Sequence, residues 1–123
     1  MPSVDLFRNE PTLRTFAAGE TVFAAGDPVD VMYIVLEGRV ELDLGKTQLE
    51  IVEPGGVFGE MALLDGHARS ATAVTLEPTR VAAIDRKRFL YLVQNTPYFA
   101  LEVMQTMAGR IRQMDHTLET FGG

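Results

Sequence analysis

Short apolar stretches separated by Gly and Pro turns fill the middle of the chain. The clearest strand region covers residues 31–44 and is broken at Glu37-Gly38. Residues 39–44 alternate polar and apolar side chains, which is typical of a half-buried strand with inward-facing Val40, Leu42 and Leu44. Further short strands are predicted in regions 15–20, 21–28, 48–52, 73–76 and 79–84. Seven or eight such strands at close spacing indicate a β-sandwich or a jelly-roll barrel.

Helical patterns replace the strands after residue 84. Asp85 is the predicted N-cap of a helix over 86–94, and Pro97 begins a second helix after the N-cap Thr96. The second helix is predicted to reach about residue 118, with an apolar stripe at Leu101, Met104, Ala108, Ile111, Met114 and Leu118. A helix of about 20 residues is about 30 Å long. We therefore expect the barrel to cover only its first turns, which leaves the rest for a second copy or another neighbour.

Residues 57–72 do not follow the strand pattern. The short stretch 60–64 has helical composition but is too short to be stable alone. Gly59 before it lets the backbone approach a ligand closely, and the free N–H groups of a first helical turn favour an anion. Arg69 follows after a short loop, and its guanidinium matches two phosphate oxygens at once. The segment therefore predicts a compact site for one anion.

Glu60 is unexpected in such a site, because its carboxylate repels a phosphate. It fits if it accepts a hydrogen bond from a hydroxyl of the same ligand, as acidic residues do for ribose in nucleotide sites. Ser70 and Ala71 would add a hydroxyl and a backbone N–H. The residues alone leave a structural alternative open, in which Glu60 interacts with a helix dipole and Arg69 forms a surface ion pair.

The composition mainly excludes classes of function. A length of 123 residues suits one domain, and a net charge of -6 argues against a free-standing nucleic-acid binder. The basic residues at 86–88, 110 and 112 are expected on solvated helix faces. The absence of cysteine excludes disulfides and thiolate metal sites. With no apolar run of about 20 residues and no signal pattern at the N-terminus, we expect a soluble, cytoplasmic protein that does not enter a membrane.

No residues form a catalytic or metal-binding pattern. His67 is expected in an exposed loop, and His116 has no second metal ligand at helical spacing. The serine and threonine hydroxyls have no evident histidine partner for nucleophilic catalysis. We therefore expect neither an enzyme nor a metal protein.

The segment 58–64, Phe-Gly-Glu-Met-Ala-Leu-Leu, followed after a short loop by Arg-Ser-Ala-Thr at 69–72, closely resembles the phosphate-binding cassette of cyclic-nucleotide-binding domains. These domains occur in catabolite activator protein, protein kinase A regulatory subunits and cyclic-nucleotide-gated channels. The resemblance extends from about residue 13 to residue 118. It implies an α+β, mainly β fold within a single domain, 1–123. An eight-stranded jelly-roll-like β-roll (13–85) would contain the cassette (58–72) with its short helix, and two C-terminal helices (86–120) would follow.

The resemblance also implies roles for individual residues. Glu60 would bind the ribose 2′-hydroxyl and Arg69 the cyclic phosphate. The pocket would further be lined by Phe58, Gly59, Met61, Ala62, Ser70 and Ala71. In catabolite activator protein, polar residues of the long helix touch the base, and the corresponding stretch here is about Met114, Asp115 and His116. Asp115 would either accept a hydrogen bond from the exocyclic amine of adenine or be exposed to solvent. A serine after the arginine also occurs in cyclic-AMP binders, so cyclic AMP is favoured as the regulatory ligand and cyclic GMP stays open.

The function implied is a non-enzymatic cyclic nucleotide sensor that transmits binding through its C-terminal helices. Its partner would be a second copy, bound through the long helix, or an unknown protein. One alternative is a ligand-independent scaffold or oligomerisation module of the same fold. The other is a truncated DNA-binding transcription regulator, because transcription factors of the family carry a winged-helix domain after the long helix. With no second domain after residues 121–123, DNA is not an expected partner of this chain.

Overall fold

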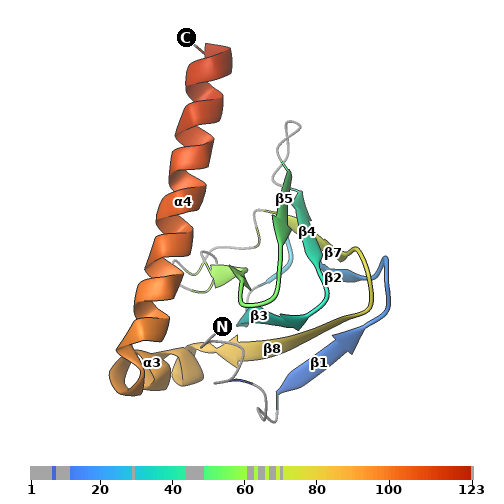
Figure 1. Cartoon of the computed structure of the whole chain (residues 1–123), viewed down its shortest axis with the longest axis vertical. Helices are drawn as coiled ribbons and strands as arrows, with labels where there is room; N and C mark the ends of the chain where they lie inside the picture. Colours follow the sequence, from blue (N-terminus) through green and yellow to red (C-terminus); the bar gives the residue numbers. More distant parts are fainter. Residues whose placement is uncertain are drawn as a thin grey trace.

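The computed structural model describes residues 7, 12–28, 30–43, 49–60, 63, 66, 69 and 71–122, with the side chains of the last helix described as far as Arg110 and at Arg112. Eight strands precede two helices (Figure 1). The strands are β1 (Leu13–Phe16), β2 (Thr21–Phe23), β3 (Val31–Glu37), β4 (Val40–Asp43), β5 (Leu49–Val52), β6 (Val57–Phe58), β7 (Thr72–Thr75) and β8 (Thr79–Asp85).

The strands form two antiparallel four-stranded sheets that face each other as a β-roll. Their strand orders are β1-β8-β3-β6 and β2-β7-β4-β5, so strands distant in the sequence become neighbours. The longest pairing joins β3 to β8, which brings the strand region around residue 33 beside the strand that leads into the helices. The expected α+β, mainly β fold with an eight-stranded roll and C-terminal helices is confirmed.

Strand β3 is apolar along nearly its whole length because both of its faces are buried. Met32, Ile34 and Leu36 pack toward the helices in a cluster that also contains Leu92, Phe99 and Val103. The alternate residues Val31, Tyr33 and Val35 face the interior of the roll and pack with Phe23, Phe58 and Val81. A strand buried on both faces reads as a continuous apolar run, which explains its pattern.

The short strand β6 corrects the sequence-based prediction. The sequence pattern excludes Val57 and Phe58 from the strands, yet in the structure they pair with Ile34 and Tyr33 of β3. A strand of two residues is too short to show alternation, so its pairing is decided by tertiary contacts. The predicted inward positions Val40 and Leu42 are buried, whereas Leu44 lies outside the described residues.

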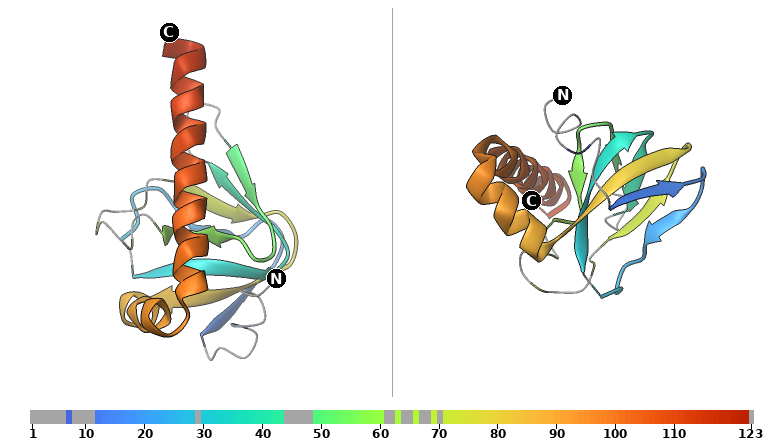
Figure 2. Two further views of the ribbon diagram at one scale, coloured as in Figure 1. Left: turned by 60° about the vertical axis from the view of Figure 1, so that its left-hand side comes forward. Right: turned by 90° about the horizontal axis from the view of Figure 1, so that it is seen from below.

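The first of the two helices, α3 (Arg86–Asn95), begins as predicted. The Asp85 side chain accepts a hydrogen bond from the Arg88 backbone N–H at 2.7 Å, which confirms the N-cap. The second helix, α4, runs from Pro97 to Gly122 and so also begins at the predicted proline. Its C-terminal end extends beyond the two sheets (Figures 1 and 2).

The face of α4 that packs on the roll differs from the predicted stripe. Phe99, Val103 and Arg110 are buried, whereas Leu101 is 46% and Met104 57% exposed. The first turns of α4 do pack on the roll, through Phe99 and Val103, but the predicted stripe is not the face that makes this contact. In the described part of the helix, Leu101, Met104 and Ala108 of that stripe are exposed. Figure 2 shows both helices on one side of the roll.

Candidate functional site

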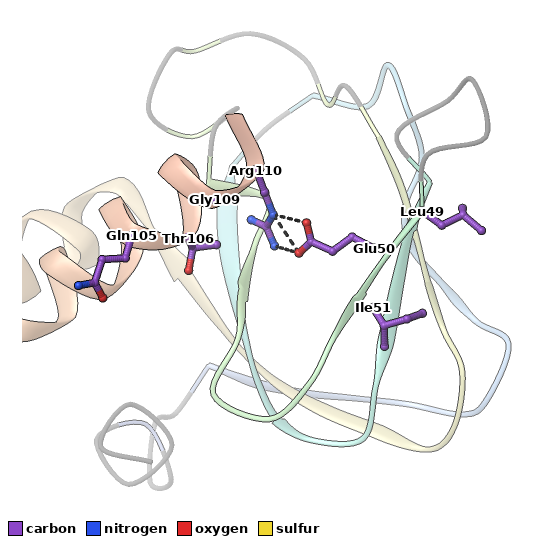
Figure 3. A pocket seen from close by; sticks show the side chains of 7 residues that line it. All are labelled: Leu49, Glu50, Ile51, Gln105, Thr106, Gly109 and Arg110. Carbon is purple, nitrogen blue, oxygen red and sulfur yellow. Dashed lines mark hydrogen bonds and ion pairs between the residues drawn. The ribbon is translucent and has the colours of Figure 1, made fainter. Parts of the chain in front are cut away.

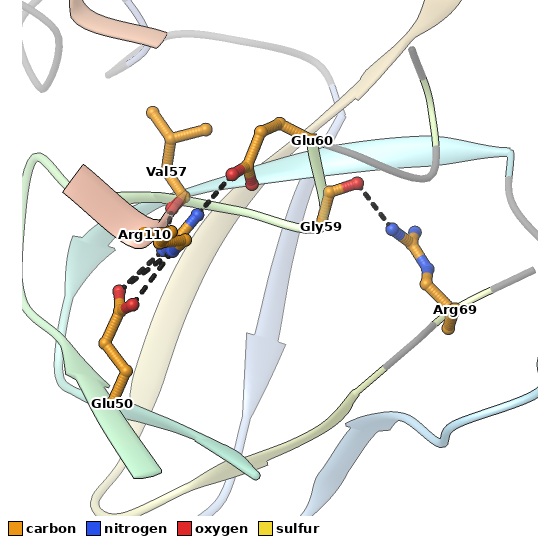
Figure 4. Close-up of polar contacts among 6 residues, drawn as sticks. All are labelled: Glu50, Val57, Gly59, Glu60, Arg69 and Arg110. Carbon is orange, nitrogen blue, oxygen red and sulfur yellow. Dashed lines mark hydrogen bonds and ion pairs between the residues drawn. The ribbon is translucent and has the colours of Figure 1, made fainter. Parts of the chain in front are cut away.

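Arg69 enters the roll from a segment held by the turn after β2. Its backbone N–H donates to Asp27 O at 2.9 Å, and its carbonyl accepts from Gly26 N at 2.8 Å. The side chain is buried, with 5% of the residue exposed. Its Nη1 donates to Gly59 O at 2.7 Å and its Nη2 to Val31 O (Figure 4 shows the contact with Gly59). Two backbone carbonyls, one in β3 and one directly after β6, therefore hold the guanidinium.

Among the described residues, no carboxylate forms an ion pair with Arg69. Arg39, Arg80 and Arg110, by contrast, are each paired with a carboxylate. Burial lowers the pKa of the Arg69 guanidinium from its usual value, while more distant acidic groups act in the opposite direction. An arginine nevertheless stays protonated at neutral pH. The site thus presents a buried cation held by neutral groups.

Gly59 has the small size that this arrangement requires. Its φ of +76° lies in the left-handed region. A Cβ at this position would lie 2.5 Å from Arg69 Nη1 and 3.3 Å from a ring carbon of Phe23. In this structure the guanidinium of Arg69 approaches this glycine closely, and the approach of a ligand to its backbone stays a prediction.

Glu60 lies on the other side of Gly59 and points toward α4. Its backbone is helical, as predicted, and 1% of the residue is exposed. Its Oε1 accepts from Arg110 Nη1 at 2.5 Å. Arg110 also donates through Nη2 to Val57 O at 2.6 Å, and through Nε and Nη2 to the carboxylate of Glu50 at 2.7–3.1 Å (Figure 4). One guanidinium thus joins α4, β5, β6 and the start of the cassette.

Arg110 corrects the prediction that it lies on a solvated helix face, since only 8% of the residue is exposed. Burial alone would lower its pKa, but the hydrogen bonds to Glu50 and the charge of Glu60 raise that pKa above its usual value. Arg112, by contrast, is exposed as predicted. Arg110 and Glu50 were not among the predicted site residues. The available signal was helical phase, because Arg110 follows Phe99 and Val103 at steps compatible with one helix face.

The remaining predicted site residues divide into two groups. Phe58 and Ala71 are buried, and the Phe58 ring stacks on Tyr33 and Phe23 at centroid distances of 5.1 and 5.9 Å. Met61, Ala62 and Ser70 lie outside the described residues, as do the side chains of Met114 and Asp115. His67 and the side chain of His116 also lie outside this part of the chain. Within it, no group of histidine and acidic side chains is placed to hold a metal ion.

A cavity of about 510 Å³ lies between β5 and α4 (Figure 3). Its lining residues are Leu49, Glu50, Ile51, Gln105, Thr106, Gly109 and Arg110. The ion pair of Glu50 with Arg110 crosses from the strand to the helix in this wall. The cavity therefore adjoins the charged cluster that holds Glu60.

The architecture and the site define a class of protein before any comparison. The roll holds a buried arginine that forms no ion pair within the described residues, beside a buried glutamate and with helices on one side. Such a site is suited to binding a small anion that carries a hydroxyl. The cyclic nucleotide-binding domain family matches residues 13–96, and the chain belongs to this family. Members of the family are defined by ligand binding rather than by catalysis. No helix within the described residues is long and apolar enough to cross a membrane.

Individual relatives agree with this assignment. The chain is 36% identical over 121 residues to the cyclic AMP receptor protein of Thermus thermophilus. This match covers 94% of the chain and 56% of that relative. It is 36% identical over 83 residues to a cGMP-dependent protein kinase of Plasmodium berghei, covering 68% of this chain and 10% of the kinase. The crystal structure of Thermus thermophilus catabolite activator protein superimposes with a TM-score of 0.80 at 32% identity, covering 98% of this chain and 59% of that one. The chain thus spans little more than half of these bacterial proteins.

Proposed function

We propose that the chain is a single, non-enzymatic sensor domain for a cyclic nucleotide, which Arg69 binds by the phosphate and Glu60 by the ribose 2′-hydroxyl. The observation that carries the proposal is the buried Arg69 guanidinium, which neutral groups hold. A carboxylate in contact with this cation would neutralise it and compete with a phosphate. Carbonyl oxygens leave its full charge available to an incoming anion.

The phosphate would meet Arg69 beside the start of the cassette. The first turn of the predicted cassette helix would offer unpaired backbone N–H donors that favour an anion. Gly59, Met61, Ala62, Ser70 and Ala71 complete this part of the proposed pocket, with Phe58 as its apolar wall. Because a guanidinium binds two phosphate oxygens at once, the cyclic phosphate of a nucleotide matches this donor set.

The ribose contact is compatible with the ion pair that Glu60 already makes. One oxygen of its carboxylate accepts from Arg110. A carboxylate has two oxygens and about four lone-pair sites, so it can accept from a ribose hydroxyl while it stays paired. The positive charge of Arg110 also limits the repulsion between Glu60 and a neighbouring phosphate.

Arg110 supplies a route from the ligand to α4. It touches Glu60 in the proposed pocket and belongs to the long helix. A ligand that contacts Glu60 changes the balance of charge around Arg110. If α4 can adopt two positions, the ligand shifts the equilibrium between them only as far as it binds one of the two conformations more tightly than the other. We expect amide hydrogen exchange in the region 103–110 to change when a cyclic nucleotide binds, with little change in β1.

The physiological nucleotide is proposed from the sequence. Cyclic AMP is favoured because Ser70 follows Arg69, and the name of the Thermus thermophilus relative includes the same nucleotide. Cyclic GMP remains the second candidate, since another relative is a cGMP-dependent kinase. Met114 and Asp115 on α4 are the proposed base contacts.

The uncovered face of α4 supports a homodimer through this helix as the output of the sensor. Leu101 and Met104 are exposed although both are large and apolar. A continuous apolar surface on a long helix is stabilised when a second helix packs against it. An unknown protein partner would use the same surface.

A second candidate is the ligand-binding part of a transcription regulator. The solved Thermus thermophilus structure is matched over 98% of this chain but over only 59% of its own. For this chain itself, with a net charge of -6, we expect no binding to duplex DNA, with or without cyclic AMP. Fluorescence anisotropy with labelled duplex at low salt would measure it, and a salt-sensitive micromolar affinity would contradict this expectation.

Calorimetric titration of the wild-type chain with cyclic AMP, cyclic GMP and 5′-AMP tests the proposed function. We expect saturable binding of at least one cyclic nucleotide, and weaker binding of 5′-AMP, whose phosphate is not tied back to the ribose. If none of the three binds at millimolar concentration, the chain is a scaffold of the same fold and the proposal is wrong.

A further inference from the structure

Phe23 lies against the proposed phosphate-binding arginine. The centroid of its ring is 4.2 Å from Arg69 Cζ, whereas the ring of Tyr33 is 5.7 Å from the same atom. A guanidinium at this distance from an aromatic ring is attracted to the negative face of the π system. The Phe23 ring itself is fixed by stacking on Tyr33 and Phe58 at centroid distances of 6.0 and 5.9 Å. The arginine thus lies against a ring that is itself packed in an aromatic cluster.

The local structure of β2 aims Phe23 at this point. Thr21 pairs with Val74 and Phe23 with the adjacent Ala73, so Val22 is the extra residue of a β-bulge. A bulge redirects the side chain that follows it. The turn after the same strand binds the Arg69 backbone through Gly26 and Asp27. One strand and its turn therefore position both the backbone and the side chain of Arg69.

Three contacts of the Arg69 guanidinium share a property. The ring of Phe23 and the carbonyls of Gly59 and Val31 are electron-rich but carry no net charge. They reduce the cost of burying the cation without neutralising it. Arg110 shows the opposite solution, because two carboxylates neutralise it. Arg69 can therefore bind an incoming anion, whereas the charge of Arg110 is already paired with carboxylates.

We propose that Phe23 is a positioning residue for phosphate recognition: its ring holds the Arg69 guanidinium in place for the anion. The inference rests on the proposed function and adds a residue outside the cassette to it. Phe23 acts through Arg69 and need not touch the nucleotide. Its contribution should therefore appear only for ligands with a phosphate, and only while residue 69 is an arginine.

The test uses the full chain and three substitutions. Phe23→Leu removes the π face and keeps an apolar side chain, Phe23→Tyr keeps the ring, and Phe16→Leu is the matched control. Phe16 is a partly buried residue packed against the same cluster. We expect Phe23→Leu to weaken binding of the preferred cyclic nucleotide about tenfold, the scale of a desolvated cation–π contact. Phe23→Tyr and Phe16→Leu should each change the affinity for the cyclic nucleotide by less than about threefold. The affinity for the matching nucleoside, which lacks a phosphate, should be unchanged by Phe23→Leu.

A double-mutant cycle shows whether the effect passes through Arg69. In an Arg69→Met background, Phe23→Leu should lower the urea midpoint of the ligand-free chain by less than it does in the wild type. If the midpoint shifts of the two substitutions are additive, the positioning role is overturned. It is also overturned if the wild type binds a cyclic nucleotide and Phe23→Leu binds it with the same affinity. A wild type that binds neither cyclic nucleotide would instead overturn the proposed function, and the positioning role with it.

Discussion

Replacing Arg110 with methionine tests the charged cluster that joins α4 to the roll. Methionine keeps much of the apolar length of the side chain and removes all of its N–H donors. Glu60 then loses the cation at 2.5 Å, and Val57 O loses a donor at 2.6 Å. Glu50 loses its partner as well, but this carboxylate is partly exposed and can be solvated by water.

The buried carboxylate dominates the expected loss. Removing one partner of a buried ion pair costs about 3–5 kcal/mol, because the remaining charge is left uncompensated. Glu60 meets this condition, since its side chain is almost completely shielded from water. We therefore expect Arg110→Met to lower the free energy of unfolding by about 4 kcal/mol. With a urea slope of about 2 kcal/mol per molar, the midpoint would fall by roughly 2 M.

Urea denaturation at pH 7 and one fixed protein concentration measures this effect. Arg112→Met is the matched control, because Arg112 is an exposed arginine on the same helix and its loss should change stability by about 0.5 kcal/mol or less. Adding Glu60→Gln to Arg110→Met removes the stranded charge and should recover about 1–2 kcal/mol. Equal stability of Arg110→Met and Arg112→Met would refute the inference that Arg110 compensates a buried Glu60.

Three further predictions concern the space around Arg69, a buried hydroxyl and the exposed face of α4. Gly59→Ala and Gly26→Ala both place an alanine at a positive φ. Each should lower the free energy of unfolding, measured by urea denaturation, by about 1 kcal/mol. Only Gly59→Ala should also weaken cyclic nucleotide binding in calorimetry, because its Cβ displaces the guanidinium, whereas nothing lies within 4 Å of a Cβ at Gly26; equal affinities would contradict this. Thr75→Val should lower the free energy of unfolding by about 1–2 kcal/mol, since the buried hydroxyl donates to Ala17 O at 2.6 Å and accepts from Glu20 N at 3.0 Å. An unchanged urea midpoint would contradict a stabilising role of this hydroxyl. Met104→Glu should abolish self-association in sedimentation at unchanged fold by circular dichroism, and a wild type that is monomeric with and without nucleotide would remove the proposed dimer.

The sequence predicts the fold well because its signals are local. Alternating residues in 39–43, the Gly and Pro turns, and the Asp85 cap each depend on neighbours within a few positions, and the structure contains the corresponding elements. Strand β6 lacks such a signal because it has two residues. The cassette motif also singles out Glu60 and Arg69 as the proposed ligand-binding residues without any knowledge of their surroundings.

The contacts of the site are less accessible to sequence reasoning because they are long-range. Arg110 meets Glu50 and Glu60 across 60 and 50 residues, and no local pattern links them. The apolar stripe through Leu101 and Met104 is a strong helix signal, but it does not say which face meets the roll. The roll instead receives the face with Phe99, Val103 and Arg110, and tertiary packing makes that choice.

The central claim is that Arg69 binds the phosphate of a cyclic nucleotide. Calorimetry of Arg69→Ala against Arg39→Ala, with the cyclic nucleotide that the wild type prefers, tests it most directly. Arg39 is a solvent-exposed arginine paired to Glu77, so its loss should leave affinity unchanged. We predict a loss of about 2 kcal/mol or more for Arg69→Ala, a reduction in affinity of roughly thirtyfold, in a protein whose circular dichroism remains native. Equal affinities of the wild type and a folded Arg69→Ala variant would contradict the account.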